Sequence, residues 1–558
     1  MADFRKCVVY QIYPKSFCDS DGDGFGDLRG VIGKLDYIQK LGVDYIWLTP
    51  FFVSPQRDNG YDVEDYYRID PRYGTMKDFE EMVAEAAKRG IGVMLDMVFN
   101  HTSDRHEWFQ KALAGDEEYK DFYIFRKGKA PGVPPTNWES KFGGSAWEYV
   151  EKFDEYYLHL FDVSQPDLNW DNPKVRREVQ KVIRFWMAKG VKGFRFDVVN
   201  LISKGKFEDD FEGDGRRFYT DGPNIHKYLR ELNAATFGTD TGIITVGEMS
   251  STSMENCFHY ANEDGKELSM VFNFHHLKVD FMGNEKWVLV PVDFQKLKDI
   301  LFSWQEGMAQ HHAWNAVFWC NHDQPRVVSR FGNEGRYWKQ SAKMLATMIH
   351  CLRGTPYIYQ GEELGMTNPN FTDISQYRDV ESINHFRILQ EKGLSEADAY
   401  RILQIHSRDS GRTPMQWTDG ENAGFTDGAP WIEVNKNCDR INAAQQLSDE
   451  DSIFHYYRKL VELRKTYDVI AMGDVEPMAQ RDPAVFAYRR TWEDEELLVI
   501  CNFYGRDVTW DGDGACSPKT LYEDGYERLL GNYEDWREEG DIFALRPYEA
   551  IVLYRKKK

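Results

Sequence analysis

The chain has 558 residues, a formal net charge of −22 at pH 7 and 42% hydrophobic residues. This length exceeds what one simple core usually holds, so we expect more than one domain. The negative charge excludes nucleic acid and acidic membranes as main partners, because their phosphates would be repelled. Eight cysteines without CxxC spacing indicate reduced thiols, and no apolar run is long enough to span a membrane. We therefore expect a soluble, cytoplasmic monomer.

The first predicted strand covers residues 7–15 and leads into an acidic loop, DSDGDGFGD (19–27). Its carboxylates and its glycine at the sixth position match the start of an EF-hand calcium loop. However, Gly30 stands where the bidentate glutamate should be, and a strand rather than a helix precedes the loop. Four carboxylates within nine residues repel each other unless a cation lies among them, but Asp/Gly clusters also form ordinary turns. The pattern alone leaves both a divalent-ion site and a bare turn open.

Predicted strands and helices alternate from there on. Apolar residues at helical spacing predict a helix over 28–41 that ends at Gly42, Thr75 opens a second helix and Asn172 caps a third. Buried strands are predicted in DYIWLTP, GVMLDMVFN, GFRFDVV, IITVGEM, MVFNF, AVFWCNHD and TPYIYQGEE. With the first strand these make eight, mostly separated by helices, which is the pattern of an α/β fold of the (β/α)8 TIM barrel type.

Two intervals break this alternation, and the end of the chain changes character. Residues 102–170 are expected to form an inserted subdomain, domain B, after the third strand, and residues 367–455 a further insertion after the eighth. Short strands such as VFAYRR, LLVICNF and EAIVLYR predict a C-terminal all-β sandwich over 478–558. The catalytic barrel is then expected to comprise residues 1–101 and 171–477.

Carboxylates end three separate predicted strands, at the face where barrel enzymes place their active sites. These residues are Asp197, Glu248 and Asp323. One such carboxylate would more simply cap a loop, but three together indicate chemistry. Glycosidic bond cleavage needs two carboxyl groups in different environments, one as nucleophile and one protonated as general acid. Arg195, on the same strand face as Asp197, is expected to keep Asp197 ionised.

At these strand ends the sequence resembles a known family. DMVFNH, GFRFDVVN, TVGEM and FWCNHD look like the four barrel motifs of the α-amylase superfamily of retaining glycoside hydrolases, and QPDLNW (165–170) resembles the motif of its oligo-1,6-glucosidase branch. The resemblance runs essentially end to end. It implies that Asp197 is the nucleophile, Glu248 the general acid/base and Asp323 the carboxylate that stabilises the transition state. It also implies a subsite for the non-reducing glucose, made of Asp58, Tyr61, His101, Arg195, His322 and Arg412.

The same resemblance bears on the acidic loop. The loop matches the calcium loop after the first barrel strand in this branch. The implied ligands are Asp19, Asp21, Asp23, Asp27 and the carbonyl of Phe25. The resemblance therefore implies a structural Ca²⁺, with Mg²⁺ as the alternative ion.

Further stretches bear on the substrate. Sucrose isomerases would be expected to carry an RLDRD-type segment after the third carboxylate, and residues 326–332 read RVVSRFG instead. Val198, beside the nucleophile, resembles enzymes that cleave linkages other than α-1,4. Segments 213–223, 245–257, 272–280 and 318–332 resemble the members of this branch that hydrolyse trehalose 6-phosphate to glucose and glucose 6-phosphate.

A phosphorylated disaccharide would need cations beside its second sugar. Basic residues in the loops after the fourth and sixth strands are candidates: Arg216, Arg217, Lys278 and Lys286. Each of them alone is also explained as a solvated surface base of an acidic protein. Two alternative functions are an oligo-1,6-glucosidase acting on isomalto-oligosaccharides and a non-catalytic transporter heavy chain. The second would lack the catalytic carboxylates and carry a membrane helix, so the sequence disfavours it.

Overall fold

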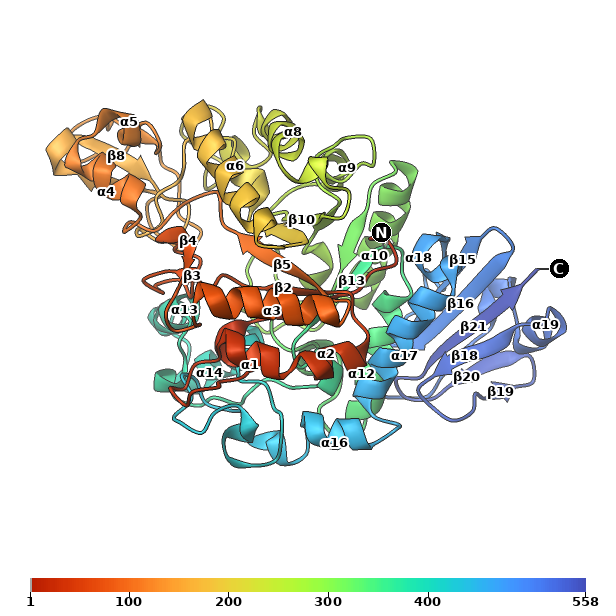
Figure 1. Ribbon diagram of the computed structural model, residues 1–558. Coiled ribbons are helices and arrows are strands. Elements are labelled where there is room, and N and C mark those ends of the chain that lie inside the picture. The colour runs from red at the N-terminus through yellow and green to blue at the C-terminus, as the bar shows by residue number, and fades with distance from the viewer. Residues whose placement is uncertain (1–2, 558) are drawn as a thin grey trace. The chain divides into compact units, whose positions relative to one another are not determined.

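A computed structural model describes residues 3–557, so residues 1, 2 and 558 of the expected terminal domains lie outside it (Figure 1). Eight parallel strands form a closed barrel in the order β1-β13-β12-β11-β10-β9-β5-β2. Their bounds are β1 (Val9–Ile12), β2 (Tyr45–Leu48), β5 (Gly92–Met97), β9 (Gly193–Phe196), β10 (Ile244–Glu248), β11 (Met270–Phe272), β12 (Asn315–Val317) and β13 (Thr355–Tyr359). All eight predicted strands are present, and the predicted TIM-barrel class is confirmed.

The described chain divides into two compact units. The first comprises residues 45–273 and 311–314. Its other strands are β3 (Phe52–Val53), β4 (Asp65–Ile69), β6 (Phe125–Arg126), β7 (Trp147–Val150) and β8 (Glu155–Leu158), of which the last three form a small sheet within 102–170. Its helices are α3 (Met76–Lys88), α4 (Glu107–Ala114), α5 (Glu117–Lys120), α6 (Pro173–Ala188), α7 (Arg216–Tyr219), α8 (Ile225–Ala235) and α9 (Met254–Tyr260).

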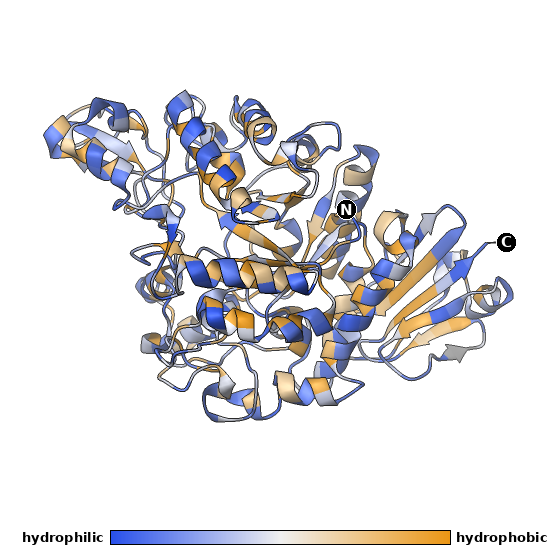
Figure 2. Ribbon diagram, viewed as in Figure 1, coloured by the Kyte–Doolittle hydropathy of each residue, from blue (hydrophilic) through white to orange (hydrophobic). Residues whose placement is uncertain are grey.

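The helix starts predicted in this unit are confirmed. Thr75 and Asp78 form a reciprocal capping box at the start of α3, and α3 buries Phe79 and Met82 on one face. Figure 2 shows hydrophilic residues alternating with hydrophobic ones along this helix. The side chain of Asn172 accepts a hydrogen bond from the Lys174 amide at 2.8 Å and so caps α6.

The second unit comprises the rest of the described chain. Its helices are α1 (Leu28–Gly33), α2 (Leu35–Leu41), α10 (Phe294–Gln310), α11 (Val327–Phe331), α12 (Trp338–His350), α13 (Val380–Glu391), α14 (Glu396–His406), α15 (Asp409–Arg412), α16 (Ala443–Ser448), α17 (Ile453–Thr466), α18 (Asp468–Met472) and α19 (Pro518–Glu523). The helix predicted over 28–41 is interrupted at Lys34, between α1 and α2. Two glycines in α1 (LRGVIG) favour this break, because glycine has low helix propensity. It ends as predicted at Gly42, which adopts the left-handed conformation (φ 93°).

The C-terminal part of this unit is antiparallel. One sheet has the order β14 (Asp474–Met478), β15 (Val485–Trp492), β16 (Glu495–Asn502), β21 (Ala550–Lys556) and β18 (Glu527–Gly531). The other has the order β17 (Val508–Trp510), β20 (Ile542–Leu545) and β19 (Glu538–Glu539). Residues including Leu498, Ile500, Trp510 and Phe543 form one buried cluster, and Figure 2 shows the larger sheet as mainly hydrophobic. The predicted C-terminal all-β module is confirmed.

Two buried cations, one on each side, connect the helices of this unit with the C-terminal module. The ammonium group of Lys298 on α10 donates to the carbonyls of Ala479 (2.7 Å) and Asp482 (2.5 Å). The guanidinium of Arg490 on β15 donates to the carbonyls of Ile470 (3.0 Å) and Gly473 (2.5 Å). Burial lowers the pKa of Lys298 to about 8, and a buried ammonium needs hydrogen-bond acceptors such as these carbonyls.

The eight cysteines are all free thiols. Among the residues described, no helix combines the length and apolar character that a bilayer crossing requires.

Candidate active site

Strand register brings together a first group of polar side chains, all within the first compact unit. Asp96 of β5 is paired with Arg195 of β9, and Phe196 is paired with Gly247 of β10. Asp197 and Glu248 therefore occupy the next position on adjacent strands. We call the group around them the β9–β10 cluster; it contains Asp58, Tyr61, Asp96, His101, Gln165, Arg195, Asp197 and Glu248.

Arg195 binds three carboxylates of this cluster at once. Its guanidinium is 1% exposed and lies 2.7 Å from both Asp96 Oδ1 and Asp197 Oδ1. It also contacts Glu248 Oε2. One positive charge thus faces three buried or half-buried acids. Such an excess of carboxyl groups favours retention of a proton.

The pKa of Asp197 shows this retention. Burial, and secondarily the neighbouring carboxylates Glu248 and Asp96, raise the pKa of Asp197 well above its usual value, although Arg195 lowers it. Arg195 acts in the predicted direction by lowering the pKa of Asp197, but burial raises this pKa by more. The carboxyl groups of Asp197 and Glu248 lie on the same guanidinium, so the charge of Glu248 contributes to the raised pKa of Asp197.

The backbone turns sharply directly after Asp197. Val198 adopts a left-handed conformation (φ 33°, ψ 41°), which is strained for a β-branched residue. Its amide points at Glu248 Oε2 at 3.3 Å. The strained residue thereby fixes the two carboxylates relative to each other.

The remaining members of the β9–β10 cluster are connected by side-chain hydrogen bonds. Tyr61 donates to Asp96 Oδ2 (3.0 Å), and the side-chain amide of Gln165 lies 3.0 Å from Asp58 Oδ2 and 3.2 Å from His101 Nε2. Burial lowers the pKa of His101 to about 4, so this imidazole is neutral. Gln165 and Asp96 were not among the predicted site residues. Gln165 opens the QPDLNW motif and Asp96 opens DMVFNH, so both carried a sequence signal.

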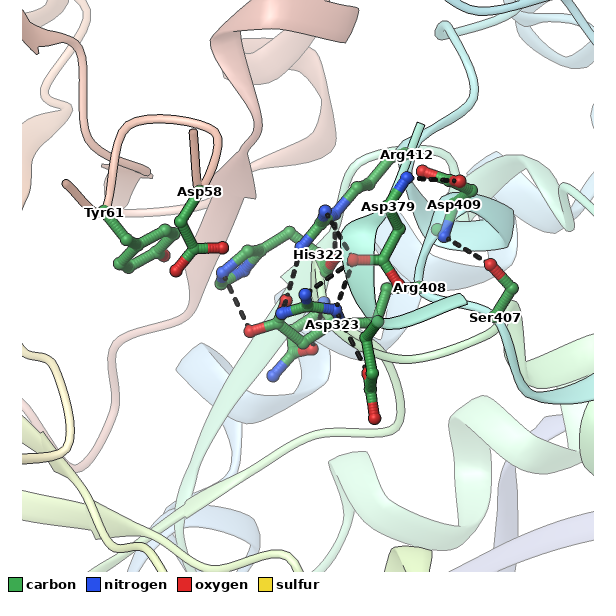
Figure 3. Close-up of polar contacts among 12 residues, drawn as sticks. Asp58, Tyr61, His322, Asp323, Asp379, Ser407, Arg408, Asp409 and Arg412 are labelled. Atoms are coloured by element: carbon green, nitrogen blue, oxygen red, sulfur yellow. Dashed lines mark hydrogen bonds and ion pairs between the residues drawn. The ribbon is translucent and has the colours of Figure 1, made fainter. Parts of the chain in front are cut away.

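A second group lies within the second compact unit, around the end of β12 (Figure 3). His322 Nε2 lies 3.2 Å from Asp323 Oδ2, and its Nδ1 lies 2.8 Å from the Gln11 amide. The Arg412 guanidinium donates to Asp323 Oδ1 at 2.7 Å. We call this group the β12 cluster; it contains Gln11, His322, Asp323, Asp379, Arg408 and Arg412.

Two arginines of the β12 cluster are shared between the same two carboxylates. Arg408 lies 3.4 Å from Asp323 Oδ1 and 2.6 Å from Asp379 Oδ1, and Arg412 lies 3.7 Å from Asp379 Oδ1. Asp379 is completely buried and begins α13 as its N-cap. Despite burial, His322 and both arginines hold the pKa of Asp323 well below its usual value. Asp379 and Arg408 were missed in the sequence, because neither lies in a motif that the resemblance covers, although Arg412 of the same insertion was predicted.

The four predicted phosphate-binding residues lie in two different surroundings. Arg216 pairs with Asp214 (2.5 Å), and Arg217 pairs with Asp210 (3.0 Å) and Glu212 (3.1 Å) in the same loop. Lys286 pairs with Glu381 (3.1 Å) in the second unit, where Lys278 is partly exposed. Each of the three paired bases would have to exchange or share an acidic partner in order to bind a phosphate.

The acidic loop gathers three of its four aspartates. One carboxylate oxygen from each of Asp19, Asp21 and Asp27 lies within 4.8 Å of the others. Asp23 is outside this group and accepts from the Phe25 amide at 2.8 Å. Asp19 accepts from several loop amides and from Thr426, and the pKa of Asp23 is raised by burial and by repulsion from the other three. The three grouped carboxylates thus offer oxygen ligands of the kind that Ca²⁺ prefers.

Comparison with known proteins places the chain in a family. The model of the alpha amylase catalytic domain matches residues 11–473. The chain belongs to this family and is a glycoside hydrolase.

Its relatives divide among several activities of that family. The trehalose-6-phosphate hydrolases of Bacillus subtilis and Escherichia coli are 56% and 54% identical, over 100% and 98% of this chain and 98% of each relative. An oligo-1,6-glucosidase of Bacillus cereus is 47% identical over 99% of each chain. The crystal structure of Bacillus licheniformis trehalose-6-phosphate hydrolase is similar with a TM-score of 0.95 and 56% identity, covering 99% of this chain and 100% of that one.

Proposed function

We propose that the protein is a retaining α-glucosidase that hydrolyses trehalose 6-phosphate to glucose and glucose 6-phosphate. The chemistry is supported by one observation above all: the carboxyl groups of Asp197 and Glu248 both contact the buried guanidinium of Arg195. The substrate is supported by full-length identity of 54–56% to hydrolases of that name.

The two carboxyl groups divide the reaction between them. Asp197 attacks the anomeric carbon while a proton passes from Glu248 to the glycosidic oxygen, releasing glucose 6-phosphate and leaving a glucosyl ester on Asp197. Glu248, now ionised, removes a proton from water, which attacks the same carbon and frees Asp197. Each step inverts the anomeric carbon, so the first product is α-glucose.

Asp323 supplies a different function. Because His322, Arg408 and Arg412 keep it ionised, it offers a fixed negative charge to the oxocarbenium-like transition state without accepting a proton. In this proposal the unmodified glucose is held by Asp58, Tyr61, His101, Arg195, His322 and Arg412.

The acidic loop completes the proposal with a structural Ca²⁺ held by Asp19, Asp21 and Asp27, to which Asp23 and the Phe25 carbonyl add on a small rearrangement of the loop. Mg²⁺ is the alternative ion. The ion takes no part in the chemistry.

The test compares hydrolysis of trehalose 6-phosphate, trehalose, isomaltose and an aryl α-glucoside by the purified protein. We expect kcat/KM to be at least about tenfold higher for trehalose 6-phosphate than for trehalose, since a charge-assisted contact contributes roughly 1.5–3 kcal/mol. A preference for isomaltose would instead establish an oligo-1,6-glucosidase, the activity named for relatives at 43–47% identity. Release of β-glucose as the first product in an NMR time course would contradict the retaining mechanism.

Alanine variants of Arg216, Arg217, Lys278 and Lys286 then test which base binds phosphate. Loss of the correct one should lower kcat/KM for trehalose 6-phosphate roughly ten- to a hundredfold, and should spare the neutral aryl glucoside. Equal loss of both activities in every variant would place phosphate recognition elsewhere.

A further inference from the structure

We propose that Lys286 and Arg408 form the phosphate-binding subsite, and that Glu381 occupies it as an internal substitute until the phosphate of the substrate displaces it. This inference rests on the proposed function for the identity of the substrate. The geometry on which it depends lies entirely within the second compact unit.

One carboxylate oxygen bridges the two cations. Glu381 Oε2 lies 3.1 Å from Lys286 Nζ and 3.4 Å from Arg408 Nε. The same arginine lies 3.4 Å from Asp323, the third proposed catalytic carboxylate. A continuous series of charge contacts therefore runs from Asp323 through Arg408 and Glu381 to Lys286. A phosphate on the second sugar lies about one ring from the bond that is cleaved, and the far end of such a series is where it is expected.

The two cations are fixed by contacts that do not involve Glu381. Arg408 donates to the buried Asp379 through two nitrogens, at 2.6 and 3.1 Å. Lys286 lies over the ring of Trp287, 4.6 Å from its centroid. Removal of Glu381 would thus leave Lys286 without its carboxylate partner beside the positioned guanidinium of Arg408. Two neighbouring cationic donors of this kind are what a phosphate monoester binds.

Glu381, by contrast, is free to leave. It lies in the first turn of α13, and its side chain is 22% exposed, so rotation carries its carboxylate into water. Lys286 (20% exposed) and Arg408 (12% exposed) are also accessible from solvent. A phosphate dianion brings more charge and three acceptor oxygens, and so competes effectively with a single carboxylate.

The substitution Glu381→Gln tests the idea directly. Removing the competing charge should raise the ratio of kcat/KM for trehalose 6-phosphate to that for an aryl α-glucoside about fivefold, since a partly screened charge contact contributes about 1 kcal/mol. Inorganic phosphate, as an inhibitor of aryl glucoside hydrolysis, should bind about fivefold more tightly. Glu391→Gln is the matched control, because it removes an exposed carboxylate from the same helix, beside Arg387.

A second variant keeps the test decisive if Glu381→Gln does not fold. Lys286→Gln should weaken inhibition by inorganic phosphate at least about tenfold relative to wild type. If Glu381→Gln lowers the ratio, Glu381 positions the two cations instead of competing for them, and the proposal is overturned. If it matches the Glu391→Gln control in both measurements, phosphate binds elsewhere.

The proposed function can fail separately. If wild type does not prefer trehalose 6-phosphate but phosphate inhibition still tightens in Glu381→Gln, the subsite stands and the assigned substrate is wrong. If wild type prefers trehalose 6-phosphate and neither variant responds, the substrate stands and the subsite is wrong.

Discussion

The β9–β10 cluster and the β12 cluster both bury several carboxyl groups, yet they shift carboxyl pKa values in opposite directions. In the first, three carboxylates share the single guanidinium of Arg195, and the pKa of Asp197 rises. In the second, two arginines and a histidine face Asp323 and Asp379, and the pKa of both carboxyls falls. The charged groups around a buried acid, set against its burial, thus move its pKa up or down. One fold can in this way hold a proton donor and a permanent anion.

The largest effect is expected from removing either carboxyl group of the Asp197–Glu248 pair. Asp197→Asn or Glu248→Gln should lower kcat by roughly 10⁴-fold or more, because each removes one half of a double displacement. The melting temperature should stay unchanged or rise, since each change also removes one of the three mutually repelling carboxylates around Arg195. Activity and thermal unfolding on the same preparations check both statements, and near-normal turnover by either variant would refute the assignment.

A substitution in the β12 cluster should change the free energy of unfolding. Asp379→Asn leaves Arg408 and Arg412 without their buried anion and should destabilise the protein by about 3–5 kcal/mol. Urea unfolding measures the loss, and Glu391→Gln serves as the surface control. A loss below about 1 kcal/mol would mean that Asp323 alone neutralises both arginines.

A pH profile separates the two clusters more finely. Asp96 raises the pKa of Asp197, so Asp96→Asn should lower it and extend activity toward acid, shifting the acid limb of kcat/KM down by roughly half a unit to one unit. Asp323 is ionised throughout that range, so the β12 cluster contributes no limb there. An upward shift would show that Asp96 acts mainly by holding Arg195 in position.

The acidic loop is a third group of carboxylates, and it should give the smallest effect. Chelation of a bound divalent ion should lower the melting temperature by a few degrees without changing kcat at a temperature where the protein is folded. Asp21→Asn should reduce the response to chelator. Identical melting curves with and without calcium would remove the proposed ion.

The sequence predicted the parts of this design that depend on local pattern. Hydrophobic runs such as GVMLDM and IITVGE predict barrel strands. The acidic residues at the ends of such runs predict Asp197, Glu248 and Asp323 as site residues. The local sequence pattern did not show which cations neutralise these carboxylates. Arg408 lies 85 residues from Asp323 along the chain, and Asp379 reaches the same site from the start of a helix in an insertion. The pairing of Arg216 with Asp214, in contrast, was present in the short segment GDGRR and was overlooked.

The buried ammonium of Lys298 has a consequence for modular engineering of this enzyme. The family model ends at residue 473, which suggests a natural place to truncate the catalytic part. However, Lys298 belongs to a barrel helix, and its carbonyl partners at Ala479 and Asp482 come from beyond that boundary. A chain cut at 473 would keep a cation in its interior and lose the oxygens that solvate it. The evolutionary boundary is therefore not an independent folding boundary, and grafts or truncations should retain the chain through at least β15, where Arg490 makes the reciprocal connection.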